Sequence, residues 1–205
     1  NNKLILGTVQ MGLPYGINNN SGKISLQNSI EILEYAFNNG IVTLDSAESY
    51  GNAHEVIGVF HDQNPNKIFK VITKLPHQVN GDIVKKVDGY LKELKVNQLE
   101  TLMFHSYASY EENIENFGLL KRLKLDKKIK TIGVSVYTNN EIEKVILNDD
   151  IDIIYRNDKF KTGLISLFEN NFNKSVSLVI SIGVNTISLR FLINTDIGSS
   201  DEPIF

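Results

Sequence analysis

The sequence predicts an α/β fold, a (β/α)8 TIM barrel, and three observations lead to this prediction. Short apolar runs alternate with amphipathic helical segments over residues 3–155, which is the pattern of strand-helix-strand units. Three successive apolar runs end at polar side chains, namely Asp45, Lys74 and His105. No Gly-x-Gly-x-x-Gly turn follows the first run, although an open nucleotide-binding sheet usually carries one there.

The first strand-helix-strand unit occupies the amino-terminal part of the chain. Residues 3–8 are expected to form the first strand, and the loop over residues 12–22 is rich in turn-forming residues. Ser25 is a suitable N-cap for the helix that follows, and residues 38–40, Asn-Asn-Gly, end it. The next strand, residues 41–44, follows at once, and such a crossover is almost always parallel and right-handed.

The same unit repeats downstream. Further strands are expected at residues 68–73, 101–104, 131–136 and 151–155, and helical segments near residues 53–60, 83–94, 119–125 and 142–146. Beyond Tyr155 the pattern becomes irregular. Residues 161–172 are compatible with one amphipathic helix, whereas residues 176–193 mix helical spacing with β-branched residues.

Two architectures fit six strands alternating with five helical segments. The length of 205 residues favours an open sheet, because a closed barrel usually needs about 250. The polar groups at consecutive strand ends favour the barrel, whose active sites are built from such positions. We therefore predict a single barrel domain over residues 1–205, incomplete or with loops missing after the sixth strand, with an irregular or interrupted C-terminal third.

Composition excludes several classes of partner. The net charge of −3 gives no electrostatic basis for binding nucleic acid or an anionic membrane. The chain has no cysteine, which removes disulfides and thiolate metal sites and suits a reducing cytoplasm. There is no apolar run near the ~18 residues of a membrane span. We expect a cytoplasmic protein without a metal site, and the sequence gives no prediction of oligomeric state.

With these residues placed, the chain resembles the aldo-keto reductase family, in particular a bacterial branch. The matching segments are Leu4-Ile5-Leu6-Gly7-Thr8, Leu44-Asp45-Ser46-Ala47-Glu48-Ser49-Tyr50-Gly51, Ile72-Thr73-Lys74, Phe104-His105 and Ile132-Gly133-Val134-Ser135. They cover about three quarters of the chain in the family's order and spacing. Residues 189–192, Leu-Arg-Phe-Leu, resemble a late barrel helix.

The resemblance implies hydride transfer from NADPH (or NADH) to a small-molecule carbonyl substrate. Four residues would be catalytic: Asp45, Tyr50, Lys74 and His105. Tyr50 would donate the proton, and a nearby ammonium from Lys74 would lower the pKa of its phenol. Asp45 would hold Lys74 in place. His105 would orient the substrate and stabilise the negative charge that develops on its oxygen.

The resemblance also implies a cofactor site at neighbouring strand ends. Gly7 and Thr8 would let the cofactor approach the barrel mouth, and Asp45 and Ser135 would complete the cofactor-binding residues. A serine at a strand end is as often a cap, and Gly7 serves a tight turn equally well. No metal is needed for this chemistry.

The chain departs from the family at its carboxyl-terminal part. Tyr155 stands where the family usually has a glutamine that contacts the nicotinamide amide, and the aromatic of the seventh strand and the late basic loop have no recognisable counterpart. Two explanations are open: a truncated gene product, or omitted loops whose flanks are joined near residues 155–158 and 198–201. The undamaged catalytic set favours the second.

Two other functions remain as alternatives. One is a non-catalytic aldo-keto-reductase-like barrel that binds nucleotide or a partner protein. The other is a barrel lyase or isomerase with Lys74 as a Schiff base, which the neighbouring Asp45 disfavours because it keeps the amine charged.

Overall fold

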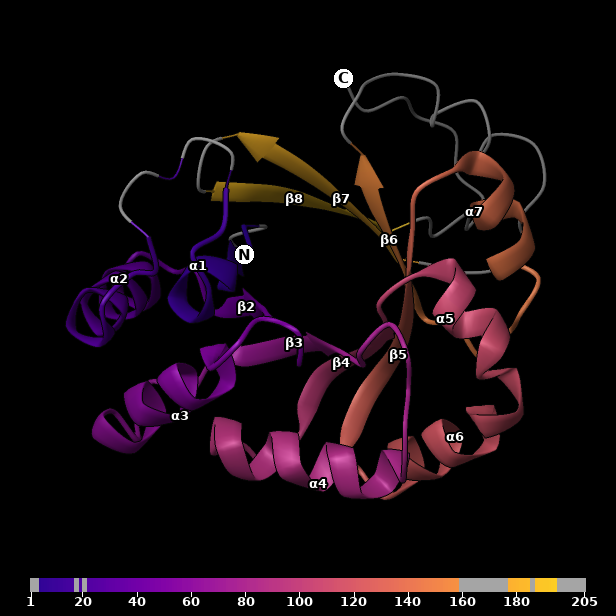
Figure 1. The fold of residues 1–205 in the computed structure, drawn as a ribbon, viewed down its shortest axis with the longest axis horizontal. Coiled ribbons are helices and arrows are strands. Elements are labelled where there is room, and N and C mark those ends of the chain that lie inside the picture. The colour runs from indigo at the N-terminus through magenta and orange to yellow at the C-terminus, as the bar shows by residue number, and fades with distance from the viewer. Residues whose placement is uncertain (1–3, 17–18, 20–21, 159–176, 185–186, 195–205) are drawn as a thin grey trace, which may run out of the picture.

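Parallel strands in sequence order form the centre of the molecule. The structure, a computed structural model, describes residues 4–16, 19, 22–158, 177–184 and 187–194. The first six strands are β1 (Leu6–Gly7), β2 (Thr43–Asp45), β3 (Lys70–Lys74), β4 (Leu99–Phe104), β5 (Ile129–Val136) and β6 (Ile153–Asp158). Each pairs in parallel with the next, and together they curl into a half-barrel (Figure 1). The predicted fold class is confirmed: the chain forms part of a (β/α)8 barrel.

Two further strands follow in the part where the sequence pattern is irregular. β7 (Ser177–Val184) pairs in parallel with β6, and β8 (Ile187–Asn194) pairs antiparallel with β7. The likeness of residues 189–192 to a barrel helix was therefore wrong, because the whole of residues 187–194 pairs with β7, and isoleucines flank the Leu-Arg-Phe-Leu stretch on both sides. The helix expected over residues 161–172 lies outside the described residues, and the single-domain organisation stays a prediction.

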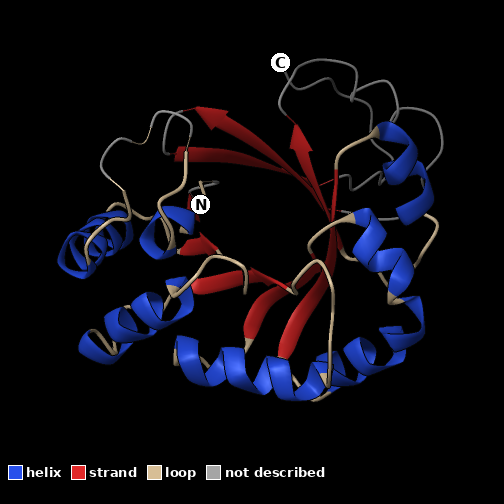
Figure 2. Cartoon of the chain, in the orientation of Figure 1, coloured by secondary structure: helices blue, strands red, loops and turns tan. Residues whose placement is uncertain are grey.

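The helices lie on the outer side of the curled sheet (Figure 2). They are α1 (Val9–Gly12), α2 (Leu26–Asn38), α3 (Ala53–Gln63), α4 (Ile83–Leu94), α5 (Tyr107–Glu112), a 3-10 turn η1 (Ile114–Asn116), α6 (Phe117–Leu125) and α7 (Asn139–Val145). The Ser25 hydroxyl caps α2 as predicted, by accepting from the Asn28 amide. Asp82 caps α4 in the same way, and Thr138 and Glu141 form a capping box on α7.

The core is divided between the two faces of the strands. Val71 and Leu102 belong to the large cluster packed with the helices, whereas Ile72 and Met103 belong to a small cluster with Tyr155. Neighbouring residues of one strand thus belong to different clusters, as the two-residue period of a strand requires. Lys74, two residues after Ile72, accordingly lies on the same face of β3 as the small cluster.

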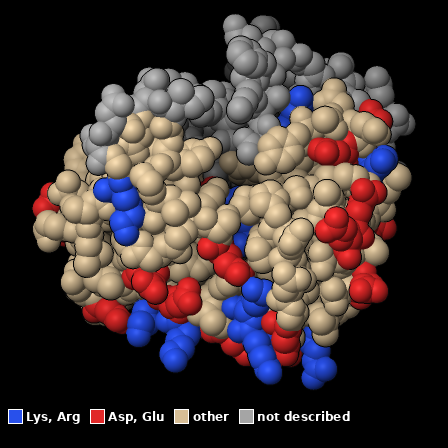
Figure 3. All heavy atoms as spheres, in the orientation of Figure 1, with Lys and Arg blue, Asp and Glu red and all other residues tan. Residues whose placement is uncertain are grey.

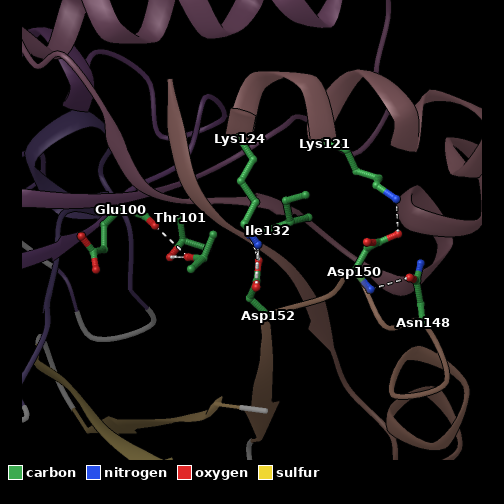
Figure 4. Close-up of polar contacts among 9 residues, drawn as sticks. Glu100, Thr101, Lys121, Lys124, Ile132, Asn148, Asp150 and Asp152 are labelled. Carbon is green, nitrogen blue, oxygen red and sulfur yellow. Dashed lines mark hydrogen bonds and ion pairs between the residues drawn. The ribbon is translucent and has the colours of Figure 1, made fainter. Parts of the chain in front are cut away.

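Ion pairs fix the segment that leads into β6 (Figure 4). Lys124 Nζ of α6 lies 2.7 Å from both carboxylate oxygens of Asp152, and Asp152 Oδ2 accepts from the Ile132 amide of β5 at 2.8 Å. Lys121 Nζ bonds Asp150 Oδ2 at 2.9 Å. These contacts hold the amino-terminal end of β6, leaving its carboxyl end for the site described below.

The surface carries charges of both signs. Lysine and arginine side chains alternate with aspartate and glutamate along the lower edge of the face in Figure 3. Within the described parts of the chain, none of the helices has the length and apolar character needed to cross a membrane.

Candidate active site

Three strands deliver polar side chains to one edge of the sheet. Asp45 is the last residue of β2, Lys74 is the last of β3, and His105 follows the last residue of β4. The register pairs Asp45 with Ile72 and Lys74 with Met103, so the carboxyl ends of these strands lie side by side. The convergence expected from the sequence is present, since parallel neighbours end at the same edge.

Asp45 and Lys74 form a buried ion pair. Lys74 Nζ donates to Asp45 Oδ1 at 2.6 Å and to the Ser46 carbonyl oxygen at 2.9 Å. The Asp45 side chain is only 4% exposed and the Lys74 side chain only 3%. A buried pair of this kind contributes little net stability, but it fixes the direction of both groups. The Lys74 ammonium is thereby held beside the carboxyl end of β2.

Tyr50 lies beside this ammonium. The Lys74 Nζ atom is 5.1 Å from the centre of the Tyr50 ring. A tight turn carries the tyrosine: its amide donates to the Ala47 carbonyl at 3.0 Å, and its carbonyl accepts from the Ala53 amide at 3.1 Å. Gly12 of α1 packs directly on this turn, because a Cβ added to Gly12 would lie 1.7 Å from the Tyr50 carbonyl oxygen.

His105 completes the group. Its ring centre lies 6.2 Å from that of Tyr50, edge-on. Burial, followed by the electrostatic effects of Lys74 and then His77, lowers the pKa of His105 to about 4, although Asp45 and a hydrogen bond to the Leu75 backbone oppose the shift. The imidazole is therefore neutral at neutral pH. A neutral imidazole can donate a hydrogen bond to a carbonyl oxygen without carrying a full charge.

The expected cofactor residues occupy strand ends on both sides of this group. Gly7 of β1 pairs with Asp45, and Thr8 donates to the Asp45 carbonyl oxygen through both its amide and its hydroxyl, each at 3.0 Å. Thr8 thus supports the backbone of Asp45. Ser135 is buried in β5. Phe104 of β4 pairs with Val134 of β5, so the residues that come next, His105 and Ser135, lie side by side.

Further side chains lie beside these residues, and two of them, His77 and Ser49, were not indicated by the sequence. His77, after β3, stacks on His105 with ring centres 4.1 Å apart, and the Ser49 hydroxyl lies 3.5 Å from His105 Nδ1. Tyr155 is buried on β6, and Lys74 Nζ lies 5.7 Å from its ring centre. His77 and Ser49 follow no periodic pattern in the sequence. Tyr155 was indicated by its place at the family's usual glutamine, and the strand that carries it continues to Asp158 rather than ending at Tyr155 as expected. Among the described residues, no three histidines or acidic side chains are grouped to hold a metal ion.

A family model with the description aldo/keto reductase family matches residues 3–174. The chain belongs to the aldo/keto reductase family. The match spans the strand ends that carry Asp45, Lys74 and His105, and it confirms the resemblance predicted from their motifs.

Individual members of the family are similar over part of their length. "Probable aldo-keto reductase 1" of Glycine max is 29% identical over 152 residues, which are 68% of this chain and 43% of the relative. The holo form of an aldo-keto reductase from Bacillus halodurans has a TM-score of 0.67 at 18% identity, covering 87% of this chain and 61% of that one. An aldo/keto reductase from Klebsiella pneumoniae, in complex with NADP and acetate, has a TM-score of 0.55 at 19% identity, covering 74% and 53%. The chain thus spans less than two thirds of each of these relatives.

Proposed function

We propose that this protein is an NADPH- or NADH-dependent oxidoreductase that reduces an aldehyde, ketone or sugar carbonyl. The observation that carries the proposal is the placement of the Lys74 ammonium, 2.6 Å from Asp45 and 5.1 Å from the Tyr50 ring centre. An acidic hydroxyl beside a fixed cation is what proton delivery to a developing alkoxide requires.

Each residue has a defined role in this reaction. The dihydronicotinamide, when bound, supplies the hydride. Tyr50 gives its hydroxyl proton to the substrate oxygen, and the Lys74 ammonium stabilises the phenolate that remains. Asp45 keeps Lys74 charged and in place. Neutral His105 donates a hydrogen bond to the substrate oxygen and so fixes the carbonyl for attack.

The residues at the neighbouring strand ends fit a nicotinamide in part. Ser135 offers a hydroxyl level with His105, where a carboxamide could be hydrogen-bonded. Tyr155 offers a ring and one hydroxyl where the family usually has a glutamine. We propose that Gly7, Thr8, Asp45 and Ser135 line the nicotinamide end of the cofactor site. The lack of cysteine in all 205 residues suits the reducing cytoplasm, where we propose that the protein acts.

Nucleotide binding tests this proposal before any substrate is known. We expect the purified full-length protein to bind NADPH or NADH saturably, measured by fluorescence titration of each nucleotide. Ser135→Ala should weaken the binding of the preferred nucleotide by up to about 10-fold, which corresponds to one lost hydrogen bond. Ser109→Ala is the control, because this buried serine lies on α5 and its hydroxyl is 3.5 Å from the Pro76 carbonyl oxygen. If neither nucleotide binds, the oxidoreductase proposal is wrong, and a barrel that binds a partner protein becomes the better account.

A further inference from the structure

A polar cluster outside the strand ends contacts the loop that carries Tyr50. The Glu48 carboxylate, two residues before Tyr50, accepts hydrogen bonds from two side chains of α4. The Tyr90 hydroxyl is one donor, and Lys86 Nζ is the other, at 3.0 and 3.3 Å from the two carboxylate oxygens. With His54 and Glu93, these residues line a cleft of about 340 Å³ between α3 and α4.

Tyr90 is suited to be a permanent donor to this loop. The Tyr90 side chain is only 4% exposed, and a buried hydroxyl needs a hydrogen-bond partner. The Glu48 carboxylate provides that partner. Burial, followed by the hydrogen bond to Glu48 and the charges of Glu48 and Glu93, raises the pKa of Tyr90. The hydroxyl therefore keeps its proton throughout the working pH range of an enzyme.

The same cluster also reaches the strand that carries Lys74. The His54 ring packs edge-on against Tyr90, with ring centres 5.3 Å apart. His54 Nε2 lies 2.8 Å from the hydroxyl of Thr73, the residue before Lys74. Burial lowers the pKa of His54 to about 4, so this ring is neutral at neutral pH. The cluster thus joins α4 to the neighbours of two catalytic residues.

The backbone of the loop is fixed on its other side. The Ser46 amide donates to the Ile72 carbonyl at 2.8 Å, and the Glu48 amide donates to the Lys74 carbonyl at 3.1 Å. The main chain of Glu48 is thus attached to β3 while its side chain is attached to α4. Movement of Glu48 would shift Tyr50 relative to Lys74, because only Ser49 separates Glu48 from Tyr50.

We infer that Tyr90 is a positioning residue, which acts through Glu48 to hold the Tyr50 hydroxyl in place for proton transfer. The inference rests on the proposed function. Misplacement of a reacting group by about 1 Å can cost about 10²-fold in rate. Loss of the Tyr90 hydroxyl loosens one attachment of the loop, so a smaller loss is expected.

Tyr90→Phe in the full-length protein tests this inference. We expect kcat for aldehyde reduction to fall by about 10-fold while the Kd for nucleotide stays within twofold. Tyr110→Phe is the matched control, because Tyr110 is another buried tyrosine whose hydroxyl accepts a hydrogen bond, from Asn148 at 2.9 Å. It should lower the melting temperature comparably and leave kcat unchanged. Glu48→Gln, which keeps an acceptor but removes the charge, should give an intermediate kcat.

A double-mutant cycle separates positioning from general damage. In the Tyr50→Phe background, Tyr90→Phe should cause no further loss, because there is no hydroxyl left to position. Equal kcat values for the parent, Tyr90→Phe and Glu48→Gln would overturn the inference, as would a full additional loss in the Tyr50→Phe background. A parent protein that reduces no aldehyde, ketone or sugar would instead overturn the proposed function, and this inference with it.

Discussion

Tyr50→Phe is expected to lower kcat for carbonyl reduction by about 10²–10⁴-fold, the usual contribution of a general acid. The substitution removes the hydroxyl that protonates the substrate oxygen but keeps the ring beside Lys74 and the turn that packs on Gly12. The Kd for nucleotide should stay the same. Steady-state kinetics and fluorescence titration on the same preparation measure the two quantities.

Tyr35→Phe provides the control for the loss of a tyrosine hydroxyl. Tyr35 lies on α2 and is 73% exposed, so its replacement should change neither kcat nor nucleotide binding. A Tyr50→Phe protein with the parent's kcat would mean that the proton comes from another group, and the role proposed for Tyr50 would be wrong.

Lys74→Met should abolish measurable reduction and also destabilise the fold. It removes the cation beside Tyr50 and leaves the Asp45 carboxylate buried without its closest positive charge. Breaking such a buried pair costs about 3–5 kcal/mol in the free energy of unfolding. Urea unfolding and aldehyde reduction measure the two effects.

A second variant separates the two effects of Lys74→Met. The double substitution Asp45→Leu with Lys74→Met replaces the pair by apolar side chains, so it should recover much of the stability but none of the activity. Lys121→Met is the control, because the Lys121–Asp150 pair is about half exposed. Its loss should change the free energy of unfolding by less than about 1 kcal/mol. Activity that returns with stability in the double variant would contradict the role of Lys74 in the reaction.

The convergence of the site could be predicted from the sequence because it follows from strand order. Asp45, Lys74 and His105 each close an apolar run, and parallel strands end at one edge of a sheet. The helix that begins after Ser25 was predictable for an equally local reason, a hydroxyl placed to cap the first turn.

Contacts between distant segments could not be predicted in the same way. The sequence predicts only that Tyr90 and Lys86 belong to an amphipathic helix. Nothing near them in the sequence indicates that they donate hydrogen bonds to Glu48. The stacking of His77 on His105 likewise depends on two loops that meet only in the folded chain. The β7–β8 pair was missed because this part of the sequence combines helical spacing with β-branched residues, which indicate opposite structures. In the folded chain the two segments pair with each other and are strands.

Isotope transfer tests the central claim most directly. The full-length protein would be incubated with a simple aldehyde and with NADPH, or NADH if it binds better, carrying deuterium at both positions of nicotinamide C4. We expect an alcohol with one deuterium on its carbinol carbon, detected by mass spectrometry, in the parent and only in traces in Tyr50→Phe. An alcohol without deuterium, or no alcohol from a parent protein that binds the nucleotide, would contradict direct hydride transfer at this site.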